Sequence, residues 1–144
     1  MPIVDVMSVR LVRVAPDESV QAAIGRMVGE NVGAVAVCDG SRLVGIFTER
    51  DVLRLAGERA RLDELRLDDV MTRNVVTVSA DSDILAAARL MGERQIRHLP
   101  VVEGENVLGL VGIRDVLGAL TERLWRLHDE EAHETVRGLL GRGR

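Results

Sequence analysis

The chain has 144 residues with a formal net charge of −4, and 47% of its residues are hydrophobic although only 1% are aromatic. This length suits one compact domain or two small units that share a core, and the slight acidity argues against a nucleic-acid-binding surface. No apolar run is long enough to span a membrane, no signal-peptide layout opens the chain, and the single cysteine, Cys38, excludes an intrachain disulfide and a cysteine-rich zinc site, all of which favours a cytoplasmic protein.

The aliphatic composition predicts a mixed α/β fold, because Val and Ile favour strands while Ala, Leu and Met favour helices. Short polar residues mark helix starts, and Asp-Gly between two apolar runs is typical of a hairpin. The first half accordingly predicts, in chain order, a strand at 11–14, a helix opened by Asp17 and Ser19, strands at 34–38 and 43–47 joined at Gly40, and a second helix from Glu49.

The second half repeats this order. Sliding the chain by 64 residues aligns the halves without a gap, with Asp5-Val6-Met7 on Asp69-Val70-Met71, Ala22-Ala23 on Ala86-Ala87, and Arg50-Asp51-Val52-Leu53 on Arg114-Asp115-Val116-Leu117. The same elements are then expected as a strand at 75–78, a helix opened by Asp81 and Asp83, strands at 99–102 and 107–111 around Gly104, and a helix from Ile113. One unit has been used twice.

Each copy, in β-α-β-β-α order, is too small to be comfortably stable alone. We expect the copies to pack through their sheets into one pseudo-two-fold α/β (α+β) module with two equivalent clefts between them. The boundaries predicted are repeat 1 at 1–57, a linker at 58–68, repeat 2 at 69–119 and a C-terminal helical tail at 120–144.

Three motifs carry a resemblance to a known family: Asp5-Val6-Met7-Ser8 with its copy Asp69-Val70-Met71-Thr72, the strand from Ile96 to Val102, and Gly45-Ile46-Phe47-Thr48-Glu49-Arg50-Asp51. Together they resemble the cystathionine-β-synthase-type (CBS) domain in its tandem form, the Bateman module. The resemblance covers Ile3 to Leu117. It implies binding of adenosine-containing ligands such as AMP, ADP, ATP, NAD or S-adenosylmethionine, and pairing into homodimers.

Thr48 and Asp51 fall where a strand ends and a helix begins. One interpretation is local: a Thr N-cap with Asp in the first turn, favourable toward the helix dipole. The other is functional, with the Asp51 carboxylate accepting hydrogen bonds from ribose hydroxyls, and the resemblance favours it. In the second copy Gly112 stands in place of Thr48 while Asp115 remains, which predicts a weaker second cleft.

Arg97 and His98 have no basic counterpart, because Gly33 and Ala34 stand at these places in the first copy. A charged pair in a buried strand is costly unless it meets an opposite charge. Two interpretations stay open: an internal salt bridge, to Glu30 or Glu93, or a phosphate contact in which arginine donates from a fixed fork.

The resemblance implies that each cleft borrows the opening segment of the other copy. Val76 and Ile96 are then expected to sandwich the adenine, and the backbone around Thr77 to read its edge. The stronger site implied is Ile46, Thr48, Asp51, Thr72, Val76, Thr77, Ile96, Arg97 and His98. The weaker site implied is Ser8, Val12, Arg13, Val32, Leu110 and Asp115.

No nucleophile–base pair, P-loop or dinucleotide fingerprint is present, and the spacing of His128 and His133 does not suit a metal site. The sequence therefore predicts no catalytic and no metal-binding residues. The leading hypothesis is a non-enzymatic regulatory module that binds an adenosine nucleotide and signals to an effector protein in trans, without nucleic-acid or membrane partners. The alternative is a ligand-independent dimerisation module with vestigial clefts.

Overall fold

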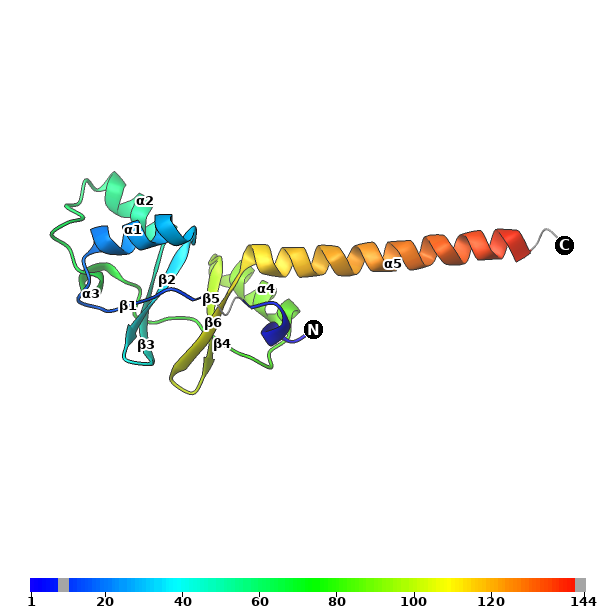
Figure 1. The fold of residues 1–144 in the computed structure, drawn as a ribbon, viewed down its shortest axis with the longest axis horizontal. Coiled ribbons are helices and arrows are strands. Elements are labelled where there is room, and N and C mark those ends of the chain that lie inside the picture. The colour runs from blue at the N-terminus through cyan, green and yellow to red at the C-terminus, as the bar shows by residue number, and fades with distance from the viewer. Residues whose placement is uncertain (8–10, 142–144) are drawn as a thin grey trace.

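The computed structural model describes residues 1–7 and 11–141 of the chain. The first repeat contains a short 3-10 helix η1 (Ile3–Asp5), β1 (Arg13–Val14), α1 (Val20–Glu30), β2 (Ala34–Asp39), β3 (Arg42–Thr48) and α2 (Glu49–Gly57). The second contains α3 (Leu67–Val70), β4 (Val78–Ser79), α4 (Ile84–Arg94), β5 (His98–Glu103), β6 (Asn106–Gly112) and α5 (Ile113–Gly141). The predicted mixed α/β repeat is confirmed (Figure 1).

Local chemistry sets these elements in the same way in both repeats. Ser19 and Asp83 cap α1 and α4, each accepting a hydrogen bond from a backbone N–H of the first turn. Both hairpins turn at a glycine, Gly40 and Gly104, each with a φ of +62° that other residues rarely adopt. The repeated sequence therefore encodes the same turns and caps twice.

The strands form one six-stranded sheet in the order β1-β2-β3-β6-β5-β4. Within each repeat the hairpin is antiparallel and the first short strand is parallel to it. The repeats are joined along the sheet by a single residue pair, Arg42 with Asn106. The strand faces turned away from the helices meet in a small apolar cluster that includes Ala36, Cys38 and Val107, so the copies pack through their sheets as predicted.

The two larger apolar cores exchange their opening segments. Ile3, at the start of the chain, is fully buried among residues of the second repeat, and its N–H donates to the Ser82 carbonyl at 2.8 Å. Leu67, at the start of the second repeat, is fully buried in the first core, and its N–H donates to the Glu18 carbonyl at 2.9 Å. Each repeat is thus completed by the segment that opens the other one.

α5 is much longer than its counterpart α2. It runs without a break to Gly141, so the boundary expected between residues 119 and 120 lies within one continuous helix. Its first turns pack on the second core through Val116 and Leu120, and the remainder projects from the body as a straight rod (Figure 1). Within the described residues, no helix combines the length and apolar character that crossing a membrane requires.

Candidate functional site

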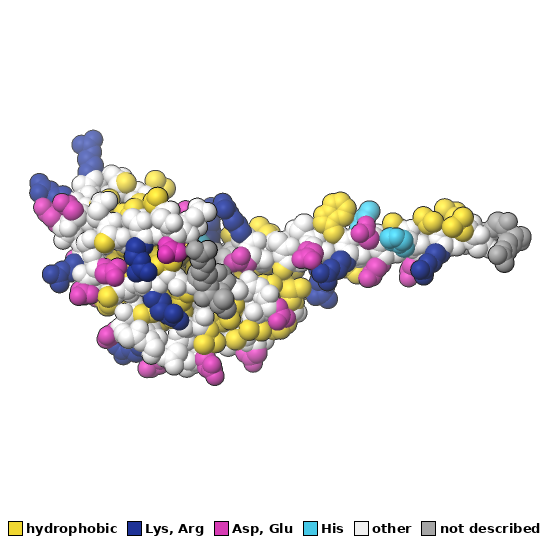
Figure 2. Space-filling view, in the orientation of Figure 1, with side chains coloured by type: hydrophobic (Ala, Val, Ile, Leu, Met, Phe, Trp, Pro, Cys, Tyr) yellow, Lys and Arg dark blue, Asp and Glu magenta, His cyan; other side chains and the backbone are white. Residues whose placement is uncertain are grey.

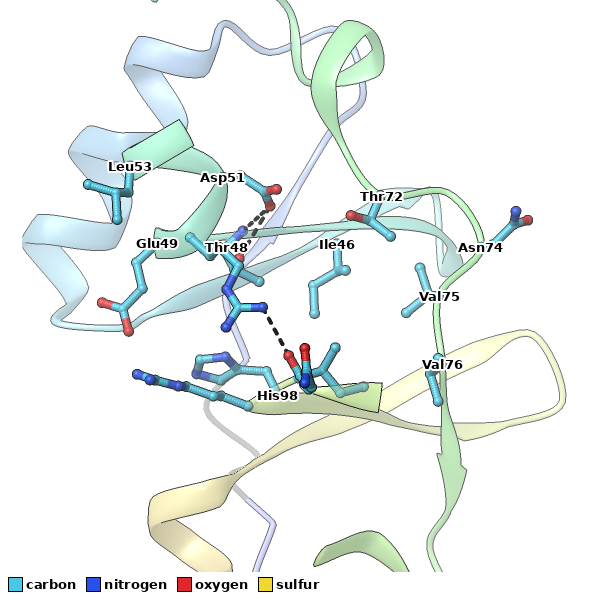
Figure 3. Close-up of a pocket in the computed structure, with 14 residues that line it drawn as sticks. Ile46, Thr48, Glu49, Asp51, Leu53, Thr72, Asn74, Val75, Val76 and His98 are labelled. Carbon is cyan, nitrogen blue, oxygen red and sulfur yellow. Dashed lines mark hydrogen bonds between the residues drawn. The ribbon is translucent and has the colours of Figure 1, made fainter. Parts of the chain in front are cut away.

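A cleft of about 680 Å³ opens between the repeats (Figure 3). One wall is the end of β3 and the start of α2, and the other is the extended segment before β4 together with the start of β5. Both repeats therefore contribute to it, as expected. Its lining comprises Ile46, Thr48, Glu49, Arg50, Asp51, Leu53, Thr72, Asn74, Val75, Val76, Gln95, Ile96, Arg97 and His98.

Thr48 and Asp51 stand together at the N-terminus of α2. The Asp51 Oδ2 atom accepts a hydrogen bond from the Thr48 backbone N–H at 2.8 Å, and the Thr48 hydroxyl lies 3.3 Å from the same oxygen. The other oxygen, Oδ1, lies 3.5 Å from an Arg54 guanidinium nitrogen, and only 14% of the Asp51 side chain is exposed. Thr48 and Asp51 therefore cap the helix, as the local interpretation expects, and the Asp51 carboxylate also lines the cleft.

A backbone contact fixes the opposite wall to β3. Ile46 and Thr72 form an isolated antiparallel bridge in which each N–H donates to the other's carbonyl at 3.0 Å. Gly45 allows this approach, because a Cβ there would lie 2.5 Å from the Met71 sulfur and 3.0 Å from the Thr72 carbonyl oxygen. Any larger residue would push the second repeat's opening segment away from the cleft.

The floor of the cleft is apolar. Ile46 is buried, while Val75, Val76 and Ile96 are half-buried and come from the second repeat. Ile96 and Val76 also pack on the second core, so their positions are held from behind. A flat apolar group such as a purine ring would remove these side chains from water at no cost in buried polar groups.

Three basic side chains lie at one end of the cleft. Arg50 of α2 donates to the Gln95 carbonyl at 3.0 Å and so bridges the two repeats. Arg97 is exposed just before β5, so the expectation of a buried arginine is wrong: the strand begins one residue later, at His98. The salt bridge considered to Glu93 is absent, since that carboxylate pairs with Arg89 at 3.0 Å.

His98 lies half-buried at the centre of the module. Burial lowers the pKa of its imidazole, and the nearby carboxylates of Glu49 and Asp115 only partly offset this effect. Both the Glu49 carboxylate and the His98 ring crowd Gly33, where a Cβ would lie 3.0 Å from Glu49 Oε1 and 3.3 Å from His98 Nε2. His98 thus lies against groups from both repeats.

The residues expected at the weaker site keep only part of this arrangement. Asp115 Oδ2 accepts from the Gly112 N–H at 2.8 Å, so the helix start is preserved without the hydroxyl. Arg13 is committed elsewhere, because its guanidinium donates to the Val107 carbonyl at 2.9 Å. Val12 is buried, Val32 and Leu110 are half-buried, and Ser8 lies outside the described residues.

The absence of a hydroxyl at Gly112 is accompanied by a second difference, on the neighbouring strand. In the first repeat the β2–β3 pair at this level is Ala34 with Thr48, whereas in the second repeat it is His98 with Gly112. The small residue has moved to the other strand, which leaves room for the imidazole ring. The asymmetry between the clefts therefore consists of two linked differences, at 98 and at 112.

One expected contact falls outside the cleft, and several lining residues were missed. Thr77 lies instead in a second hollow of about 400 Å³ with Arg42 and Arg73. The missed residues are Glu49, Arg50, Leu53, Asn74, Val75 and Gln95. Arg50 had a visible signal, because it repeats with Asp51 at Arg114-Asp115; the others follow only from how the segment before β4 crosses β3.

The fold and the cleft define a tandem-repeat module with a ligand-sized cavity between its halves. The family model of the CBS domain matches residues 3–58 and 67–122, and the chain belongs to this family. The chain is 30% identical over 112 residues to the CBS domain-containing protein YhcV of Bacillus subtilis, covering 78% of this chain and 80% of that protein. It is 35% identical over 122 residues to the mitochondrial CBS domain-containing protein CBSX3 of Arabidopsis thaliana, covering 78% of this chain and 59% of that one.

Solved structures of CBS-domain proteins have the same fold as this chain. The CBS-domain containing protein ATU1752 of Agrobacterium tumefaciens superimposes with a TM-score of 0.75 at 32% identity, covering 83% of this chain and 98% of that one. The CBS domain pair of protein MJ0100, crystallised with 5-methylthioadenosine and S-adenosyl-L-methionine, superimposes with a TM-score of 0.79 at 23% identity, covering 85% of this chain and 98% of that one. The tandem CBS fold is confirmed.

Proposed function

We propose that this chain is a non-catalytic regulatory module that binds an adenosine-containing nucleotide in the cleft beside Asp51. The observation that carries the proposal is one arrangement: a carboxylate at a helix start, an apolar floor and basic side chains at one end, all within the same cavity. Ribose hydroxyls, a purine and a phosphate need these three surfaces in turn. The adenosine derivatives held by the CBS domain pair of MJ0100 support the choice of ligand class.

Within this proposal Asp51 and Thr48 hold the ribose, Ile46, Val76 and Ile96 hold the base, and Arg97 and His98 hold phosphate. Thr72 presents its backbone beside Ile46 at the edge of the base. The clefts are unequal, and the one containing Asp115 is the weaker. The ligand candidates are AMP, ADP, ATP and NAD, with S-adenosylmethionine as the non-phosphorylated comparison.

The signal would pass to an effector protein in trans, with the module acting as a homodimer. Exposed apolar side chains on the helices support dimerisation, and most of them lie on α5, where Leu124 is 67% exposed and Leu139 is 66% exposed. A ligand that contacts both repeats stabilises one arrangement of the two repeats relative to others. A protein bound to both repeats would respond to that change.

Isothermal titration calorimetry with each candidate ligand tests the proposal. Binding of at least one adenosine nucleotide at micromolar to millimolar concentration is expected, and Asp51→Ala should abolish or strongly weaken it. If none binds at millimolar concentration to a folded protein, the nucleotide function is wrong and the ligand-independent dimerisation module takes its place.

A further inference from the structure

The projecting part of α5 has no cover within the described chain. Every residue from Thr121 to Gly141 is exposed. Seven of the twelve large hydrophobic side chains exposed in the described structure lie on this helix: Leu117, Leu124, Trp125, Leu127, Val136, Leu139 and Leu140 (Figure 2). Helices in proteins gain most of their stability by packing an apolar face, and exposed apolar surface of this kind marks an interaction site.

One row of residues along α5 has the same spacing on both sides of His128, toward the start and toward the end of the helix. Its steps of three and four residues keep most members within about 40° of His128 around the helix, with Leu120 and Val136 at the two edges of the stripe. Counted outward from His128, the members lie in pairs at four, eight and eleven residues: Leu124 and Ala132, Leu120 and Val136, Leu117 and Leu139. A stripe that is unchanged when the helix is reversed fits an antiparallel copy of itself.

In such a pair, with His128 of the two copies side by side, large residues meet smaller ones. Leu124 of one copy faces Ala132 of the other, and Leu120 faces Val136, so the two surfaces interlock. Leu139 then reaches Leu117, which is 55% exposed and follows Val116 of the second core. The pair would therefore span the free length of the helix and end where the body begins.

The charges favour the antiparallel direction. Before His128, the segment from Glu122 to Leu127 holds two arginines and one glutamate; after it, the segment from Asp129 to Glu134 holds four carboxylates. A parallel pair would place the four carboxylates of one copy beside those of the other. An antiparallel pair instead places them beside the segment that carries Arg123 and Arg126, which removes this repulsion.

We infer that a second copy of this chain covers α5, and that the two helices pair antiparallel about His128. The inference rests on the homodimer of the proposed function and names the surface that forms it. Nucleotide binding in the cleft beside Asp51 does not depend on it, because none of the residues lining that cleft lies on α5.

Light scattering on matched variants tests the surface. The wild-type chain should have the mass of a dimer, and Leu124→Glu should give a monomer at the same micromolar concentration. Arg137→Glu is the control: this side chain is exposed on the same helix but lies about 180° around it from His128, and the variant should remain dimeric. Both variants should bind nucleotide as wild type does.

Disulfide cross-linking in a Cys38→Ala background tests the direction. His128→Cys should cross-link to itself on oxidation. Leu117→Cys should not cross-link alone but should do so when mixed with Leu139→Cys. Self-linking of Leu117→Cys would show a parallel pair and overturn the inference. If Leu124→Glu remained a dimer, the pairing through α5 would be wrong although the homodimer would stand. If the wild-type chain were a monomer, both the pairing and the homodimer would be wrong, and another protein would be the partner of α5.

Discussion

At the scale of single residues, the two aspartates at the helix starts provide an internal control. Asp51 and Asp115 each accept a backbone hydrogen bond at 2.8 Å from the residue three positions earlier, so removing either side chain should destabilise its helix, and removing Asp51 should do so more because its carboxylate also lies 3.5 Å from Arg54. Only Asp51 is proposed to hold the ribose of the tight site. Differences in ligand affinity between the two folded variants therefore report binding rather than folding.

Asp51→Ala should weaken nucleotide affinity by about 1.5–3 kcal/mol, the range for hydrogen bonds to a charged group. Asp115→Ala should leave the tight binding event largely intact. Calorimetry with the same nucleotide on both variants measures the difference, and thermal denaturation verifies that both variants are folded at the temperature of the titration. Equal loss of affinity in both would place the site elsewhere.

Arg97→Ala should weaken AMP binding about three- to tenfold, which is less than for a buried charge-assisted contact because solvent screens this exposed side chain. Adenosine, which lacks the phosphate, should bind equally well to wild type and variant. Arg94→Ala, an exposed arginine that does not line the cleft, controls for the change in net charge. Equal effects of Arg97→Ala on AMP and adenosine would remove Arg97 from the phosphate contact.

His98 should make the free protein less stable in mild acid. Because burial holds its pKa in the folded state below the ordinary value of about 6.5, the unfolded chain binds the proton more readily. Stability is therefore complete above pH 6.5, falls as the pH drops through 6.5, and levels off below the folded-state pKa. The melting temperature should fall less between pH 7.5 and 5.5 in His98→Gln than in wild type; an identical fall would show that other groups cause it.

The sequence predicted most of this site, and for definite reasons. Thr48 and Asp51 lie three residues apart in one local motif, and Val76, Ile96 and Thr72 were placed by the resemblance; all five line the cleft. Thr77 does not, and Asn74, Val75 and Gln95 were missed, because their positions depend on where an extended segment crosses β3. No local periodicity in the sequence encodes that crossing.

At the scale of elements, the repeat predicted the helices and hairpin strands to within a residue or two, since caps and turn glycines recur 64 residues apart. The first strands were less well predicted: only Arg13–Val14 and Val78–Ser79 form ladders, and each pairs with just two residues of a longer neighbouring strand. The full length of α5 also escaped prediction, since helix-forming residues in a tail do not reveal whether they continue an earlier helix.

Gly45→Ala should damage both the fold and the cleft. The new methyl would collide with Met71 and the Thr72 carbonyl, so we expect a loss of about 1–3 kcal/mol of stability, as for other overpacking substitutions, together with weaker nucleotide binding. Gly25→Ala is the control, because this helical glycine has open space around it and should gain up to about 1 kcal/mol. Denaturant unfolding measures the stability of both variants. If Gly45→Ala were as stable as wild type, the backbone contact between Ile46 and Thr72 would adjust to the methyl group at little cost.

At the scale of the whole molecule, the unequal clefts predict the form of a titration. One tight event per chain is expected, followed by a loose event or none, because the second cleft lacks the Thr48 hydroxyl, has Arg13 committed to Val107, and has Gly33 where the first has a basic side chain. A lost neutral hydrogen bond alone accounts for roughly 0.5–1.5 kcal/mol. Calorimetry showing two equal sites per chain would contradict this account of the asymmetry.

The exchanged opening segments have a consequence for synthesis on the ribosome. The first core is complete once Leu67 and Met71 have emerged, so the first repeat can assemble before the second is made. Ile3, although translated first, finds its place only against Ser82 and the strands that follow it. The N-terminal segment is therefore among the last parts of the chain to find its native contacts, and until the second repeat has been made it remains available to chaperones and proteases.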